Sequence, residues 1–467
     1  MCILPRVPEW WIINLACIRQ KVVLLPGTTQ LQEKDILLRL GASKADCVIA
    51  DLETAHKVDN IGIDGQVKAK ILIGGTKEGW LSWDQLFQSA DEIHTPIKTQ
   101  KDEIMQIFFT SGTVGSPKMV PHTHTSYGYC HFVTGKYWLD LTKDDVHWNI
   151  SDSGWAKSAW SSLFGPFSQG CTLFVHGMPR FAPLEILQTL TNYPITTLCA
   201  PPTLYRSLLQ EDLKKYKMNT LRHCVSAGEP LNEEVIYSWE EALGIVIKEG
   251  YGQTESTLLC GTFKKMNKWV KPGSIGKPAP GYDVRIVNNM GQEVARGEQG
   301  NIGVKIKPNK PPGLFAGYID DPEATSHSFI GDYYLTGDRA VQDEDGYLWF
   351  QSRTDDLIIS SGYRIGPFEV ESALLEHPAV EESAVVSSPD MDRGQVVKAF
   401  IVLSRTHKQI MGIVEEEEAL ISQLQEHVKN TTAPYKYPRK IEFVESLPKT
   451  VSGKIRRKVL RDKENMH

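Results

Sequence analysis

The sequence lacks the features that mark several large classes of protein. Its eight cysteines lie at positions 2, 17, 47, 130, 171, 199, 224 and 260, and no two of them form a Cys-x-x-Cys pair. This scatter excludes the spacing of a zinc site or a disulfide framework, so we expect small core residues in a reducing compartment. The longest apolar stretch, residues 10–25, is interrupted by Asn14, Arg19, Gln20 and Lys21. It predicts no bilayer span.

A basic excess is also absent. The formal charge is -6 and the pI is near 6.1, so the composition predicts neither a nucleic-acid partner nor binding to an anionic membrane. The N-terminus shows no charged leader, and the chain shows no repeat or low-complexity tract. With 467 residues, 41% of them hydrophobic, the chain is long enough for two or more cores. We therefore expect a multi-domain soluble enzyme.

A glycine-containing loop follows the apolar run 104–109, which predicts a buried strand. The loop reads Thr110-Ser111-Gly112-Thr113-Val114-Gly115-Ser116-Pro117-Lys118. Glycine accepts positive φ angles, which lets successive backbone N–H groups point at one anion, so the loop fits a phosphate chain. It is not a Walker A loop, because Pro117 precedes the lysine and holds Ser116 away from helical geometry. Taken alone, a flexible connection is the alternative.

Strand-like and helix-like segments alternate along the first half of the chain. Strands are predicted at residues 2–4, 22–25, 47–50, 70–73, 173–175, 195–198 and 223–226, and helices at 9–19, 35–40, 184–191 and 203–211. This alternation is typical of an α/β fold with a largely parallel, buried sheet. After Pro272, short strands at 284–287, 302–306 and 347–351 predict a small β-rich subdomain.

The last segment, from residue 356 on, has a βα pattern of its own. It predicts strands at 357–359, 382–387, 396–403 and 440–443, and helices at 367–376 and 415–429. The four glutamates 415–418 lie where a helix dipole favours anions, so they indicate a helix start rather than an acidic tract. We expect a large N-terminal α/β domain over residues 1–354 and a small α+β C-terminal domain over residues 355–467.

Five further stretches follow the loop. They are Tyr251-Gly252-Gln253-Thr254-Glu255, Thr336-Gly337-Asp338, Arg353-Thr354-Asp355-Asp356, Ser361-Gly362-Tyr363-Arg364-Ile365-Gly366 and Pro448-Lys449-Thr450-Val451-Ser452-Gly453-Lys454. Together with the loop they resemble the adenylate-forming superfamily of acyl-CoA synthetases, luciferases and peptide-synthetase adenylation domains. Each stretch alone is weak, but six in the right order are specific. Residues 5–11 and 432–440 most resemble the medium-chain acyl-CoA synthetases of vertebrate mitochondria.

The resemblance implies ligation of a short- or medium-chain fatty acid, or an aromatic acid, to coenzyme A through an acyl-adenylate. Joining a carboxylate to the α-phosphate of ATP brings anions together, so cations and fixed donors must offset the developing charge. By resemblance, Lys454 bridges the carboxylate and the α-phosphate, Thr254 contacts that phosphate, and Glu255 holds Mg²⁺. Without the resemblance, Lys454 would be an ordinary solvated lysine and Glu255 an acidic turn residue.

The resemblance also implies the rest of the nucleotide site. Asp338 would accept the ribose hydroxyls and Arg353 would donate to the same sugar, although Thr-Gly-Asp is also a common turn. Gly228-Glu229-Pro230 resembles a wall around the adenine and the substrate. The remaining residues implied to bind ATP are Thr110 to Lys118 of the loop, Glu249, Gly250, Tyr251, Gly252, Gln253 and Thr254.

A second half-reaction would deliver the thiol of coenzyme A. In the superfamily the C-terminal domain rotates about a hinge aspartate between the two steps, and Asp355 matches that residue. Trp155, Thr254 and Arg364 would contact the acid, with a buried core position as the alternative for Trp155. The residues implied to bind coenzyme A are Gln30, Ser361, Gly362, Tyr363, Arg393, Lys429, Tyr437, Pro438 and Arg439.

The chain departs from the family pattern in several places. Val114 replaces a usual Ser or Thr, which predicts weaker ATP binding by one neutral hydrogen bond, about 0.5–1.5 kcal/mol. Lys21 stands where a helix usually ends in glycine, which predicts a strain of about 1 kcal/mol if its φ is positive. Family members also carry a transit peptide and further residues before this start, so we expect the first domain to be incomplete.

Two alternatives remain at this point. The acyl-adenylate could be passed to a carrier protein or another acceptor, although the residues implied to bind coenzyme A argue against this. The chain could also be a truncated, non-catalytic isoform that binds only nucleotide or a partner. The family implies the mitochondrial matrix, and we expect a monomer.

Overall fold

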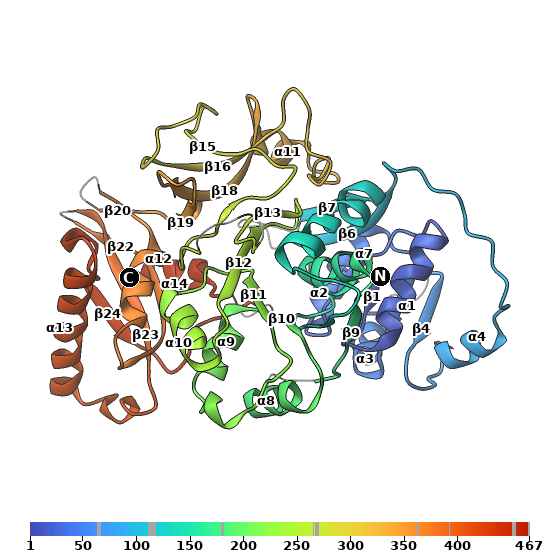
Figure 1. The fold of residues 1–467 in the computed structure, drawn as a ribbon, viewed down its shortest axis with the longest axis horizontal. Coiled ribbons are helices and arrows are strands. Elements are labelled where there is room, and N and C mark those ends of the chain that lie inside the picture. The colour runs from blue at the N-terminus through green and yellow to red at the C-terminus, as the bar shows by residue number, and fades with distance from the viewer. Residues whose placement is uncertain are drawn as a thin grey trace.

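A five-stranded parallel sheet forms one end of the computed structural model (Figure 1). The structure describes residues 1–62, 67–110, 118–178, 182–264, 266, 270–360, 363–391, 393–450 and 454–465, with the backbone alone at 355 and 364. In spatial order the strands are β2 (Pro26–Gly27), β1 (Cys2–Ile3), β3 (Cys47–Ala50), β4 (Ala69–Leu72) and β5 (Leu81–Ser82). The helices are α1 (Pro8–Arg19), α2 (Glu33–Ser43), α3 (Leu52–Asn60) and α4 (Trp83–Ser89).

The predicted βαβ unit at the start is confirmed, with one correction. β1 pairs in parallel with both β2 and β3, and α1 begins at Pro8, whose fixed φ suits a first helical turn. The strand predicted at 22–25 is wrong, because the residues that pair with β1 are Pro26 and Gly27. The apolar run before them instead makes a single bridge from Leu24 to Gln106.

A seven-stranded sheet forms the centre of the molecule. Its strands are, in spatial order, β14 (Lys277–Pro278), β13 (Leu258–Gly261), β12 (Ile247–Gly252), β11 (His223–Ala227), β10 (Thr197–Ala200), β8 (Val146–Asn149) and β9 (Thr172–Phe174). The five strands from β12 to β9 are parallel, as predicted, and β13 and β14 are antiparallel. The helices α8 (Pro183–Asn192), α9 (Pro202–Leu208) and α10 (Glu233–Leu243) follow successive strands and pack into the same core.

A β-hairpin brings both ends of the glycine-containing loop together. β6 (Ile104–Thr110) and β7 (Lys118–Thr123) are antiparallel, and Thr110 pairs with Lys118. The loop residues 111–117, including Val114, lie outside the described residues. Short helical segments follow β7, namely η1 (His124–Tyr129), α5 (His131–Val133), η2 (Thr134–Trp138), α6 (Ala156–Ser158), η3 (Ala159–Phe164) and α7 (Gly165–Gln169).

A small antiparallel sheet is the predicted β-rich subdomain, at the top of Figure 1. It consists of β15 (Val284–Val287), β16 (Gln299–Lys305), β18 (Tyr333–Gln342), β17 (Phe329–Ile330) and β19 (Leu348–Arg353), with α11 (Pro322–Ser328) beside it. The register places Asp338 of β18 opposite Arg353 of β19.

The C-terminal part is a separate α+β unit at the left of Figure 1. Its main elements are β20 (Ile358–Ser360), β21 (Tyr363–Ile365), α12 (Pro367–Leu375), β22 (Val380–Asp390), β23 (Gly394–Leu403), α13 (Val414–Thr431), β24 (Lys440–Phe443) and α14 (Arg457–Asn465). Every strand and helix predicted there is present. Among the described residues, no helix is long and apolar enough to cross a membrane.

Candidate active site

Asp338 of β18 accepts hydrogen bonds from residues at the end of β12 and just after it. Tyr251 Oη donates to Asp338 Oδ2 at 2.6 Å, and Gln253 Nε2 donates to the same oxygen at 2.9 Å. Gln253 Nε2 also reaches the carbonyl of Thr336, which ties the segment after β12 to β18. Burial raises the pKa of Asp338, while Arg353 and these donors oppose that shift. The carboxylate is therefore held in one orientation, with Oδ1 3.6 Å from Nε of Arg353.

Lys454 reaches this cluster from the C-terminal unit. The Lys454 side chain is exposed to solvent. The surrounding protein nevertheless lowers the pKa of the ammonium by desolvation. The carboxylates of Glu229, Asp338 and Glu255 counteract that decrease, and Arg353 adds to it. The structure thus brings together Lys454, Glu255, Asp338 and Arg353, which belong to four different motifs of the sequence.

Glu255 presents its carboxylate from the turn after β12. Tyr318 Oη donates to Glu255 Oε1 at 2.8 Å, and burial raises the pKa of the carboxyl. No group of three or more His, Cys, Asp or Glu able to hold a metal exists among the described residues. A single carboxylate that shares its ion with substrate phosphates is how Mg²⁺ is usually bound, so Glu255 fits that ion together with ATP.

The carbonyl oxygen of Thr254 accepts hydrogen bonds from two buried side chains, His122 and Tyr127, which the sequence did not indicate. His122 Nε2 lies 2.6 Å and Tyr127 Oη 2.8 Å from this oxygen. Burial lowers the pKa of His122 to about 3, so its ring is neutral, and Nε2 must carry the hydrogen because a carbonyl only accepts. Trp160 Nε1 donates in turn to Tyr127 Oη. No spacing in the sequence links residues 122 and 127 to 254.

Two glycines of β12 are required by close packing. A Cβ on Gly250 would lie 2.5 Å from the Trp138 ring, and one on Gly252 would overlap the Thr257 carbonyl and the Trp160 ring. Glu249, on the same strand, accepts the Leu231 N–H with Oε1 at 2.9 Å. Burial raises the pKa of Glu249 to about 8. The predicted residues 249–252 therefore lie on β12, between β11 and β13 of the central sheet.

Basic and aromatic side chains cluster separately in the C-terminal unit. Arg439 donates to Tyr437 Oη at 2.6 Å, and the Lys429 ammonium lies 4.6 Å from the Tyr437 ring centre. Tyr363 stacks on Tyr435 at 4.3 Å between ring centres. Arg393 lies in the turn between β22 and β23, and the Pro438 carbonyl accepts from Gln425. The hydrogen bonds that the structure shows for Gln30 are local, to Thr28 and Gln32, so it does not join this cluster here.

The comparisons with known proteins agree over almost the whole chain. The "AMP-binding enzyme" family profile matches residues 1–319, and the "AMP-binding enzyme C-terminal domain" profile matches residues 369–454. The mitochondrial acyl-coenzyme A synthetase ACSM3 of Homo sapiens is 54% identical over 99% of this chain and 78% of its own length. ACSM4 of Homo sapiens is 52% identical over 99% of the chain and 79% of its own length.

The chain belongs to the acyl-coenzyme A synthetases of the AMP-binding enzyme family. A solved anthranilate CoA ligase in complex with anthranoyl-AMP superimposes with a TM-score of 0.91 at 30% identity, covering 100% of this chain and 88% of that one. ATP-bound MatB from Rhodopseudomonas palustris has a TM-score of 0.85 at 26% identity, covering 99% and 88%. The predicted α/β fold with its small C-terminal domain is thus confirmed. The family's reaction uses ATP, Mg²⁺ and coenzyme A.

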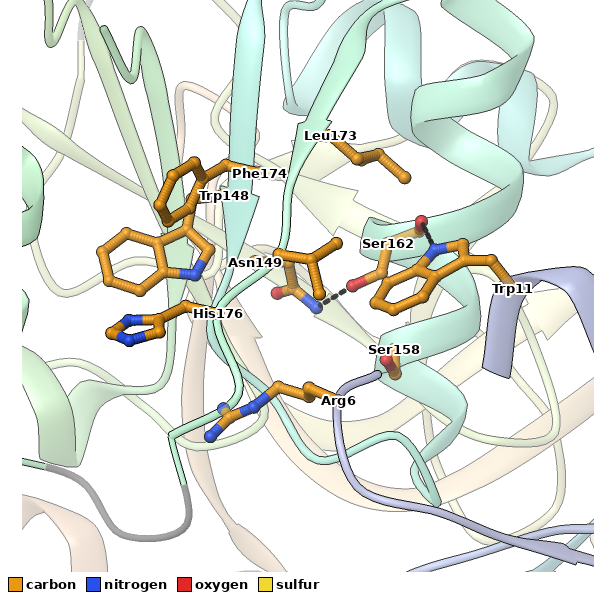
Figure 2. A pocket seen from close by; sticks show the side chains of 10 residues that line it. Arg6, Trp11, Trp148, Asn149, Ser158, Ser162, Leu173, Phe174 and His176 are labelled. Carbon is orange, nitrogen blue, oxygen red and sulfur yellow. Dashed lines mark hydrogen bonds between the residues drawn. The ribbon is translucent and has the colours of Figure 1, made fainter. Parts of the chain in front are cut away.

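A small cavity in the synthetase has none of Glu255, Asp338, Arg353 and Lys454 among its lining residues (Figure 2). Arg6, Trp11, Asn149 and Ser162 are among its lining residues, and Trp11 and Asn149 both hydrogen-bond to Ser162. The space open to the centre of a water molecule is about 10 Å³, enough for one water and too small for a fatty acid. Trp155, which is half-buried, does not line it.

Several predicted residues of the synthetase lie outside the described part. They are Ser111 to Pro117, Ser361 and Gly362, together with the side chains of Asp355 and Arg364. The condition on Lys21 is met, because its φ is 56°. Tyr318 is the contact to Glu255 that the sequence analysis missed, because it lies far from every motif used and belongs to no pattern among them.

Proposed function

We propose that this chain ligates a short- or medium-chain fatty acid, or an aromatic acid, to coenzyme A through an acyl-adenylate. The observation that carries the proposal is the meeting of Lys454 with Glu229, Asp338 and Glu255. An ammonium beside several carboxylates is suited to bind an incoming phosphate, which would replace the carboxylates as its partner. The identity of 54% to an acyl-coenzyme A synthetase supports the reaction class.

In the first step, each residue would act on the developing negative charge or on the position of ATP. Lys454 would bind the acid carboxylate and the α-phosphate at once, which offsets their mutual repulsion. Asp338 would accept the ribose hydroxyls, and Arg353 would donate beside it. Thr254 would donate to the α-phosphate and Glu255 would hold Mg²⁺, which neutralises phosphate charge when bound. The residues 110–118 would hold the β- and γ-phosphates.

The second step, transfer of the acyl group to coenzyme A, would use a different arrangement of the N-terminal and C-terminal domains. We place the N-terminal domain at residues 1–354, the C-terminal domain at 355–467, and the hinge at Asp355. The charges of Glu229, Asp338 and Glu255 act on Lys454, and the hydrogen bonds shown for Gln30 are local, which supports an arrangement before rotation. Rotation would withdraw Lys454 and bring the coenzyme A residues, including Ser361, Gly362, Tyr363 and Arg393, to the adenylate. Trp155 and Arg364 would contact the acid.

Location and assembly follow from the relatives. Both human relatives carry mitochondrial in their names, and we place this chain in the mitochondrial matrix. We propose that it acts as a monomer, since each group used above comes from one chain.

The proposal is tested by pyrophosphate release from ATP with purified protein and Mg²⁺. The acids are butyrate to dodecanoate and benzoate, each with and without coenzyme A. We expect acid-dependent release that yields acyl-CoA and AMP when coenzyme A is present. Folded protein that releases no pyrophosphate with any acid would overturn the catalytic proposal and favour a form that only binds nucleotide or a partner.

A further inference from the structure

Tyr318 makes a direct contact with the side chain of Glu255. Its hydroxyl donates to Oε1 at 2.8 Å, so this carboxylate oxygen is fixed in direction. Three residues earlier, the N–H of Phe315 donates to the main-chain carbonyl of Glu255 at 2.8 Å. The segment from Phe315 to Tyr318 therefore forms hydrogen bonds to both the backbone and the side chain of Glu255.

The backbone at Tyr318 is itself fixed from two sides. Its N–H donates to Thr325 Oγ1 of α11 at 2.9 Å. The N–H of Ile319 donates to the Met119 carbonyl at 3.0 Å, and these two residues form an isolated β-bridge. Met119 follows Lys118, the last residue of the glycine-containing loop. The bridge therefore places Tyr318 beside the end of that loop.

The ring of Tyr318 meets the loop lysine. Lys118 Nζ lies 4.7 Å from the centre of the ring, a distance at which an ammonium is attracted to the aromatic face. The ring thus contacts Lys118 and the hydroxyl contacts Glu255. One side chain joins the two segments that hold the phosphates and the metal in the proposed function.

We propose that Tyr318 is a positioning residue that fixes the Glu255 carboxylate for metal-bound ATP and couples it to Lys118. This inference rests on the proposed function. With Oε1 occupied by Tyr318, Oε2 remains for the ion, and the carboxylate does not need to be ordered when the metal nucleotide binds. Removing a side chain that hydrogen-bonds to a metal ligand commonly weakens metal binding by about 10-fold to 100-fold.

The hydroxyl and the ring can be separated by substitution. Tyr318→Phe keeps the ring beside Lys118 and removes only the donor to Glu255. The chain offers a matched control in the same subdomain, because Tyr333 Oη donates to Glu293 Oε1 at 2.6 Å, away from the nucleotide cluster. Tyr333→Phe removes the same kind of hydrogen bond.

The test is calorimetric binding of ATP with Mg²⁺ and, separately, of ATP with EDTA. We expect Tyr318→Phe to weaken the binding of magnesium-ATP about tenfold and to leave the binding of metal-free ATP unchanged. Tyr333→Phe should match the wild type in both titrations. In turnover, Tyr318→Phe should raise the KM for ATP and leave the KM for the acid unchanged.

A double-mutant cycle with Glu255→Gln completes the test. If Tyr318 acts through Glu255, the double variant should bind magnesium-ATP no more weakly than Glu255→Gln alone. Equal weakening with and without metal, additive losses, or no change in Tyr318→Phe would overturn the inference. A wild-type protein that binds no magnesium-ATP would instead contradict the proposed function.

Discussion

Asp338 is buried, Glu255 is half-buried and Lys454 is exposed, yet the surrounding protein shifts the pKa of all three. Burial raises the pKa of Asp338 and Glu255 and lowers the pKa of Lys454; both carboxylates oppose the decrease at Lys454, and Lys454 opposes the increase at Asp338. Their charges therefore depend on one another, so removing one changes the protonation of the others. The anionic phosphates of ATP would take the place of the carboxylates beside Lys454.

Glu249 allows a direct test of how burial of one carboxyl group changes the pH dependence of stability. Its pKa is raised from 4.5 to about 8, so the folded chain keeps a proton that the unfolded chain releases between these values. The contribution of Glu249 to the free energy of unfolding should be highest below pH 4.5 and decrease toward pH 8, by up to about 1.4 kcal/mol per pH unit. Glu249→Gln imitates the neutral acid and has no proton to lose.

We expect the wild type to lose stability relative to Glu249→Gln as the pH rises from 5 to 8, measured by urea unfolding. The substitution Glu241→Gln, at an exposed glutamate of α10, is the control and should show no such divergence. Parallel curves for the wild type and Glu249→Gln would mean that Glu249 ionises as freely in the folded protein as in the unfolded one.

At the scale of elements, the sequence predicted the types of segment well and their partners poorly. The bounds of β24 and β15 agree with the prediction, because each is an apolar run between clear turn signals. The strand at 22–25 was misplaced, because an apolar run shows burial and not which residues pair. Asp338 and Lys454 were predicted through the family pattern, whereas Tyr318 and His122 make contacts that only folding creates.

The end of helix α1 provides an element-scale prediction. Val22 N–H donates to Cys17 O and Lys21 N–H to Ile18 O, which is the Schellman pattern, and Lys21 has the φ of 56° that glycine usually supplies. Lys21 Nζ also lies 2.6 Å from Glu103 at the surface. We compare Lys21→Gly with Lys21→Ala, because both lose this ion pair.

We expect Lys21→Gly to unfold at higher denaturant concentration than Lys21→Ala, by about 1 kcal/mol in the free energy of unfolding. The difference isolates the backbone strain, since an exposed ion pair contributes at most about 1 kcal/mol and is absent from both variants. Equal stabilities would show that the positive φ costs nothing at this helix end.

At the scale of the whole molecule, the two parts meet through a contact suited to separation. Asn232 Nδ2 donates to Ser372 Oγ at 3.0 Å between the N-cap of α10 and helix α12. Burial, followed by the charge of Glu376 across the same boundary, raises the pKa of Glu233 and Glu234. Like charges on the two sides of this boundary weaken the interface, which would favour the proposed rotation of the C-terminal part.

Cross-linking across this boundary should stop the second half-reaction only. The double variant Asn232→Cys and Ser372→Cys, treated with a short bis-maleimide, should still release pyrophosphate but no longer form acyl-CoA. The wild type treated in the same way controls for reaction at its own cysteines, of which Cys17, Cys47 and Cys130 are partly accessible. Cross-linked protein that forms acyl-CoA at the untreated rate would contradict a required rotation.

The most direct test of the account measures the two half-reactions of Lys454→Ala separately. Pyrophosphate release from acid and ATP should decrease at least about 100-fold, the loss expected when a group that stabilises transition-state charge is removed. Formation of acyl-CoA from supplied acyl-adenylate should remain near that of the wild type. Lys408→Ala, at a lysine paired with Glu381 on the surface, should leave both steps unchanged. Unchanged pyrophosphate release by Lys454→Ala, or an equal loss in both steps, would contradict the role assigned to this lysine.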